Sequence, residues 1–166
     1  MTLANTVDGD TAGTRSLNIS ATGIGSTVTL GDAVGATNRL SAFDITGTTI
    51  SFNGPTVNTT GNQSYAGALT LGANTTLSAS NLQTVSGSVF EGAGKSLSIV
   101  ANAALDGVIN NVSQFSVSGT TNLAGNVSSM GNQTYAGAIV LRGDSALLAS
   151  GANSVITSTG EINSNS

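Results

Sequence analysis

The side chains that could carry out acid–base chemistry are few and lie far apart along the chain. The sequence contains no histidine and no cysteine, so neither a nucleophile–histidine pair nor a zinc site of the usual composition can be assembled. Polysaccharide lyases and glycosidases need two or three carboxylates that converge on one substrate. The acids occur singly, most of them beside glycine where turns are expected: Asp8, Asp10, Asp32, Asp44, Glu91, Asp106, Asp144 and Glu161. We therefore predict no catalytic residue, no metal and no cofactor, and we expect that the chain is not an enzyme.

Two narrower possibilities for ligand chemistry are also disfavoured by the sequence. Asp8-Gly9-Asp10 lacks the repeated Gly-Gly-x-Gly-x-Asp pattern of calcium-binding β-rolls, so a turn is expected there. Only four residues are basic, at positions 15, 39, 95 and 142, and the formal net charge is −4. Because a nucleic-acid-binding surface needs a basic patch, we expect no nucleic-acid partner.

The elements that must position any site are predicted by a long internal repeat. Residues 61–71 (GNQSYAGALTL) return at 131–141 (GNQTYAGAIVL) without insertion or deletion. The alternation within the repeat is typical of a β-strand, with Tyr65, Gly67 and Leu69 on one side. We expect that side to be buried, with Gly67 leaving space for the ring of Tyr65.

A shorter unit, hydrophobic-x-Gly-x-hydrophobic, recurs through the middle of the chain. Its first hydrophobic residue stands at positions 65, 85, 105, 123 and 135. A period of about 20 residues with an alternating interior is typical of a β-solenoid, in which each unit forms one coil. The residues that we expect to define the repeat are Tyr65, Gly67, Leu69, Val85, Gly87, Leu105, Gly107, Leu123, Gly125, Tyr135, Gly137 and Ile139.

Longer matches extend the repeat toward the N-terminus. Residues 15–19 resemble 95–99, and 43–49 resemble 115–121. Treating the stretch from Leu105 to Tyr135 as one long coil with an outward loop, we predict three coils between Tyr65 and Tyr135. The two tyrosines should then lie on one face of the rod, roughly 14 Å apart along its axis, at about 4.8 Å per coil.

The Gly-Asn-Gln-Ser/Thr-Tyr-x-Gly-Ala pattern, followed by Asn74-Thr75-Thr76-Leu77, resembles the repeats of filamentous-haemagglutinin-like giant bacterial surface adhesins. The Gly-Ala-Gly-Lys-Ser-Leu run at 92–97 is also similar to a segment between strands of such proteins. The resemblance implies an all-β, right-handed parallel β-helix, here of roughly seven coils of about 20–23 residues. It also implies export to the bacterial cell surface. We interpret residues 1–166 as a single solenoid segment excised from a longer repeat protein.

The resulting functional prediction is a structural stalk of a secreted or surface-anchored adhesin. Its expected partners are adjoining repeats, glycans of host cells, neighbouring cells or the matrix, and a second copy joined end to end. The alternative is a carbohydrate-active segment on the same fold. Outward threonine arrays that bind ice are disfavoured because Thr70 and Thr76 are matched by Val140 and Ala146 in the second copy of the long repeat.

Seven Asn-x-Ser/Thr sequons occur, but a chain so rich in these residues produces several by chance. For Asn62 and Asn132, which occupy equivalent positions, we instead predict corner residues that hydrogen-bond one coil to the next.

Overall fold

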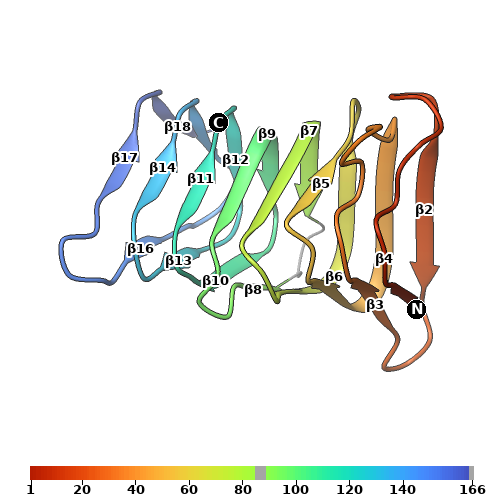
Figure 1. Ribbon diagram of the computed structural model, residues 1–166. Coiled ribbons are helices and arrows are strands. Elements are labelled where there is room, and N and C mark those ends of the chain that lie inside the picture. The colour runs from red at the N-terminus through yellow and green to blue at the C-terminus, as the bar shows by residue number, and fades with distance from the viewer. Residues whose placement is uncertain (85–88, 165–166) are drawn as a thin grey trace.

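The computed structural model of the chain is a solenoid of about seven turns whose strands all pair in parallel (Figure 1). The structure describes residues 1–84 and 89–164. Within these two ranges there is no helix, and therefore none that could cross a membrane. The prediction of an all-β parallel β-helix with about seven coils is confirmed.

Each turn places strand segments on three faces, which we call A, B and C. Face A carries β2 (Ser16–Ala21), the first parts of β4 (Ala42–Phe52) and β6 (Gln63–Leu71), the second parts of β7 (Thr75–Thr84) and β9 (Leu97–Leu105), and then β12 (Thr121–Leu123), β15 (Ile139–Leu141) and β18 (Ile162–Ser164). Face B carries β1 (Thr2–Leu3), β3 (Thr27–Leu30), the second parts of β4 and β6, β8 (Val89–Glu91), β10 (Val108–Val112), β13 (Val127–Ser129) and β16 (Leu147–Ala149).

Face C is the one turned toward the viewer in Figure 1. It carries β5 (Thr56–Asn58), the first parts of β7 and β9, β11 (Phe115–Val117), β14 (Gln133–Tyr135) and β17 (Ile156–Ser158). Isolated bridges from Val7 to Val34 and from Val34 to Val57 continue this face toward the N-terminus.

The core consists of one inward column of side chains for each face. On face A, for example, Ile45 pairs with Tyr65 and Leu105 pairs with Leu123, and all four side chains are buried. Because alternate residues of a strand point to opposite sides, the residues between them face solvent and are mostly Ser, Thr and Asn. Each coil therefore buries its apolar stripe against the coils above and below it.

The short glycine-centred unit corresponds to one corner of the solenoid, where the chain passes from one face to the next. Leu105 and Leu123 are direct neighbours on face A, whereas Ile109 and Val127 are direct neighbours on face B. Gly107 and Gly125 lie between them at the A-to-B corner, as Gly67 does between Tyr65 and Leu69. Val85 and Gly87 lie outside the described residues.

The prediction that Tyr65 and Tyr135 share a face is wrong. Tyr65 pairs with Ile45 on face A, whereas Tyr135 pairs with Val117 on face C. The error lies in treating the stretch from Leu105 to Tyr135 as one coil. Leu123 pairs directly with both Leu105 and Leu141, so each of these two intervals is a complete coil with no outward loop. Tyr135 lies within the second of them, two faces beyond Leu123.

The long repeat is therefore a duplication displaced by one face. Three successive inward pairs on face A of the first half return in the same order on face C of the second half. The pairs are Leu17 and Ile19, Phe43 and Ile45, and Gln63 and Tyr65 on face A, matched by Leu97 and Ile99, Phe115 and Val117, and Gln133 and Tyr135 on face C. Ile139 of the later copy accordingly lies on face A, whereas Leu69, its counterpart in the first copy, lies on face B.

The aromatic packing repeats with the sequence. The rings of Phe43 and Tyr65 are edge-to-face with centroids 6.4 Å apart, and those of Phe115 and Tyr135 are arranged likewise at 5.8 Å. Such pairs stabilise a core beyond their buried area. The duplicated segments thus keep their packing although they occupy different faces.

Gly67 is required for a different reason from the one predicted. Its φ is +143°, which side-chain-bearing residues rarely adopt, and a Cβ atom there would collide with the carbonyl oxygen of Gly47 in the preceding coil. At the same corner two residues of β4 oppose one of β6, since the register shifts between Thr46 and Thr49. Gly67 therefore allows two backbones to approach closely and is not a space for the ring of Tyr65. Gly137 meets the backbone of Gly119 in the same way.

We predict that Gly67→Ala destabilises the protein by about 1–3 kcal/mol, because the new methyl group forces the backbone of two coils apart. Urea unfolding followed by circular dichroism measures this change. Gly23→Ala is the matched control, since nothing lies within 4 Å of a Cβ at that position, and its effect should stay within about 0.5 kcal/mol. Equal effects of the two substitutions would contradict the close approach at the corner.

Candidate functional site

The most specific arrangement of polar groups in the described chain is a buried glutamine–tyrosine pair at a corner. The hydroxyl of Tyr65 donates to Oε1 of Gln63 at 3.0 Å. Nε2 of Gln63 donates to the carbonyl oxygens of Val57 and Ser78, each at 2.9 Å. Gln63 thus joins its own coil to the next one, and both the oxygen and the nitrogen of its buried amide have hydrogen-bond partners.

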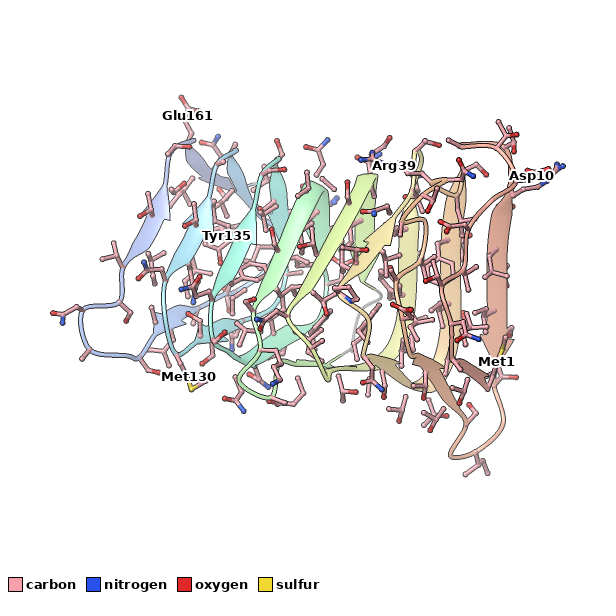
Figure 2. All side chains as sticks on the ribbon, in the orientation of Figure 1. Met1, Asp10, Arg39, Met130, Tyr135 and Glu161 are labelled. Atoms are coloured by element: carbon pink, nitrogen blue, oxygen red, sulfur yellow. The ribbon has the colours of Figure 1, made fainter. Side chains whose placement is uncertain are left out.

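The second copy reproduces this network on a different pair of faces. The hydroxyl of Tyr135 donates to Gln133 at 2.9 Å, and Nε2 of Gln133 donates to the carbonyls of Val127 and Leu148 at 3.3 and 2.8 Å. In Figure 2, Tyr135 lies within the stack of strands. The two glutamines were not among the predicted repeat-defining residues. The sequence does contain a feature that points to them: each glutamine stands two positions before a tyrosine, and therefore on the same, buried side of the strand.

Burial changes the titration of both phenols. Burial, with a smaller contribution from the negative charge of Asp44, raises the pKa of Tyr65 well above its ordinary value. Burial likewise raises the pKa of Tyr135. Neither phenol is accessible, so each serves as a hydrogen-bond donor inside the core and not as an acid–base group for a substrate.

The outward asparagines of the corners join successive coils, as predicted. Nδ2 of Asn81 donates to Oδ1 of Asn62 at 3.1 Å, and Nδ2 of Asn102 donates to Oδ1 of Asn81 at 3.4 Å. Oδ1 of Asn132 accepts from the backbone N–H of Val155 at 2.9 Å. The prediction for Asn62 and Asn132 is confirmed.

The acidic residues remain dispersed in the structure. Asp10 pairs with Arg15 at 2.8 Å on the surface, and this hydrogen-bonded guanidinium lowers the pKa of the Asp10 carboxyl. Figure 2 shows Asp10 and Glu161 near opposite ends of the rod. In the described part of the chain no three acidic side chains gather into a group that could hold a metal ion. The expectation that acids beside glycine lie in turns fails for Glu91, which belongs to β8.

A shallow hollow of about 230 Å³ lies on face C and is the candidate contact surface for a ligand. It spans β9, β11 and β14, and its polar rim contains hydroxyl and amide groups without any charged side chain. The lining residues are Ser96, Leu97, Ser98, Gln114, Phe115, Ser116, Asn132 and Thr134. Neutral donors and acceptors in a hollow are suited to sugars or amides, whose own groups are uncharged and hydrogen-bonding.

The hollow lies on a continuous row of outward hydroxyl groups. The strand register aligns them one per coil along face C: Thr56, Thr76, Ser98, Ser116, Thr134 and Thr157. Oγ of Ser116 donates to Oγ of Ser98 at 3.1 Å, so these two neighbours in the row are hydrogen-bonded to each other. Comparison of the two copies of the long repeat could not reveal this row, because it matched residues of different faces.

The regularity of the hydroxyl row on face C bears on whether this surface could bind ice. Thr70 lies on face B and Val140 on face A, so their difference says nothing about the regularity of one surface. The neighbouring outward row of face C is mixed, however, with Asn58, Ser78 and Val100 in register. The hydroxyl array therefore extends in one dimension only, whereas an ice lattice needs two.

No family model, curated protein or solved structure matches the chain. The resemblance to adhesin repeats therefore rests on the sequence pattern alone.

We predict that the glutamine–tyrosine pair is energetically coupled. Tyr65→Phe leaves Oε1 of Gln63 without its donor, and Gln63→Leu leaves the buried Tyr65 hydroxyl without its acceptor and removes the hydrogen bonds to Val57 and Ser78, so each should cost about 1–3 kcal/mol. Because the two side chains share one hydrogen bond, the double variant should lose about 1 kcal/mol less than the sum. Urea unfolding of the four proteins measures the coupling, and Gln133→Leu with Tyr135→Phe repeats it at the second copy. Strict additivity at both corners would contradict the network.

We also predict that stability falls as the pH rises above about 10, the ordinary pKa of tyrosine. The folded state holds the two phenolic protons more tightly than the unfolded state does, so deprotonation favours unfolding. This contribution is fully present below pH ~10 and is lost progressively above it. The midpoint of urea unfolding measured from neutral to alkaline pH tests the expectation. The Tyr65→Phe, Tyr135→Phe double variant should show a flatter profile; an unchanged profile would contradict the assignment.

Proposed function

We propose that the chain is a structural stalk segment of a secreted or surface-anchored bacterial adhesin, with face C as the surface that contacts glycans. The observation that carries the proposal is the combination of an unbroken three-column core with an outer surface made mainly of neutral hydroxyl and amide groups. Such a rod is stiff because each coil is held by backbone hydrogen bonds and packing to both neighbours.

The likeness of residues 61–77 and 92–97 to repeats of filamentous-haemagglutinin-like exoproteins supports a place at the bacterial surface. The mostly uncharged outer surface is also consistent with contact to neutral polysaccharides. Their hydroxyl groups can exchange hydrogen bonds with Ser98, Ser116 and Thr134, which lie in register at about 4.8 Å per coil. A sugar chain that runs along the rod would meet one such hydroxyl in each coil.

The alternative from another class is a carbohydrate-active segment on the same fold. A lyase or glycosidase requires converging carboxylates, and the hollow of face C is lined by none. The stalk is therefore the function that we prefer.

The test measures binding and cleavage in the same samples. The purified protein is incubated with neutral and acidic polysaccharides, and retention in affinity electrophoresis is compared with the formation of new reducing ends. We expect retention by a neutral polysaccharide without cleavage, and Ser116→Lys on face C should weaken it by at least about tenfold, or 1.4 kcal/mol.

Asn122→Lys is the matched control, because it adds the same charge to face A of the same coil. Its retention should equal that of the unmodified protein. New reducing ends would favour the enzyme over the stalk, and equal loss in both variants would mean that face C is not the contact surface.

A further inference from the structure

The hollow on face C takes the same two outward positions from each of three successive coils. Its strands β9, β11 and β14 lie side by side on the front face in Figure 1. The two rows that line it are Ser96, Gln114 and Asn132, directly before the strands, and Ser98, Ser116 and Thr134, two positions later. The side chains of Leu97 and Phe115 between the rows point into the core. The hollow is therefore a shallow groove that runs along the rod and repeats once per coil.

Both rows of this groove keep hydrogen-bonding groups for a ligand. Gln114 and Thr134 are exposed, and their side chains make no hydrogen bond within the described part of the chain. Asn132 accepts a backbone N–H of the next coil through Oδ1, which leaves the two donors of Nδ2 for a ligand. Ser116 donates to Ser98, so the hydroxyl hydrogen of Ser98 and the lone pairs of Ser116 stay available. Each coil thus offers uncharged donors or acceptors to the groove.

The groove cannot bind a sugar by stacking, because every aromatic side chain of the protein is buried. The six are Phe43, Phe52, Tyr65, Phe90, Phe115 and Tyr135. Hydrogen bonds between neutral groups replace bonds to water, so each contributes little net free energy of binding. Useful affinity therefore requires many such bonds at once, along a ligand whose own repeat matches the spacing of the coils.

A β-(1→4)-linked glucan has such a repeat. Its equatorial linkages keep the chain straight, and each sugar advances it by one pyranose ring, close to the ~4.8 Å between coils. Each sugar also carries hydroxyl groups on both edges, which would face the two rows of the groove. An α-(1→4)-linked chain of the same sugar curls, so its successive sugars leave a straight row.

We propose that the groove of face C binds extended, uncharged β-(1→4)-linked glycans lengthwise, with one sugar over each coil. The inference rests on the proposed function, because it specifies which glycan face C contacts. The groove lies within the solenoid, since β11 pairs with β9 on one side and with β14 on the other. The hydroxyl row continues beyond it to Thr76 and Thr157, so a longer glycan meets further hydroxyl groups in both directions.

The experiment compares two series of ligands that differ only in linkage. The cello-oligosaccharides from cellobiose to cellohexaose and the malto-oligosaccharides of the same lengths are titrated into the protein, and the Kd of each is measured by NMR. We expect the Kd of the cello series to fall by about threefold or more with each added sugar. Maltohexaose should bind at least about tenfold more weakly than cellohexaose, because only its first sugars can meet the row.

Three variants locate the contact. Thr134→Val removes one hydroxyl from the groove with little change of shape and should raise the Kd of cellohexaose by about threefold. Thr46→Val is the matched control, since Thr46 is exposed on face A and its side chain makes no hydrogen bond in the described chain. Thr76→Val alters the row one coil beyond the groove, so it should weaken cellohexaose and leave cellotriose unchanged. Circular dichroism checks the fold, and Gln114→Ala replaces Thr134→Val if that variant unfolds.

The failure of this inference differs from the failure of the proposed function. Equal affinity for the two series, or a Kd of the cello series that does not change with length, would overturn the inference while glycan contact stands. So would equal effects of Thr134→Val and Thr46→Val, or cellohexaose binding that Thr76→Val leaves unchanged. Retention of a neutral polysaccharide of another linkage without binding of cellohexaose would have the same meaning. Binding of no glycan at all would overturn both.

Discussion

Parallel backbone hydrogen bonding between successive coils is the constraint on which the rest of the structure depends. It holds each strand in register with the strand one turn away, and so places like side chains above one another in columns. The corners must accept the same close spacing as the strands. Where two backbones approach most closely, as at Gly67 over Gly47, only glycine fits. At such a corner the need for glycine therefore follows from the close stacking of two backbones and not from the packing of individual side chains.

The buried glutamines place an amide group in the apolar core near a corner, where an unpaired polar group would be costly. Gln63 and Gln133 each donate to two strand carbonyls from different coils, and a tyrosine hydroxyl donates to the amide oxygen. The buried glutamine and its tyrosine partner thus form a structural unit that occurs at more than one corner.

The three faces are equivalent enough that the duplication could be displaced from face A to face C. Each face needs only an alternating strand and a glycine or asparagine corner, so a segment that packs on one face also packs on another. The outer surfaces do not share this equivalence. Face C gains a continuous row of hydroxyl groups through Ser98, Ser116 and Thr134, whereas the corresponding outward row of face A contains Asp44 and Ser64. Surface chemistry therefore differs between faces even where the core repeats.

The sequence by itself determined the class of fold and the units from which it is built. Period-2 alternation and the glycine-centred unit predicted a β-solenoid, and the step from Leu105 to Leu123 corresponds to one true coil. The equivalent Asn62 and Asn132 were correctly placed at corners. These features are local, since they depend on residues adjacent in the chain.

Only the tertiary structure decided which face each segment occupies. Tyr65 and Tyr135 have the same neighbours in sequence, but the lengths of the intervening turns set their angular position around the axis. That position accumulates over several coils of unequal length, as the short coil from Leu123 to Leu141 and the longer one from Leu141 to Ser164 illustrate. The hydroxyl row of face C depends on the same angular positions. No local pattern encodes it, because every face accepts the same kind of strand.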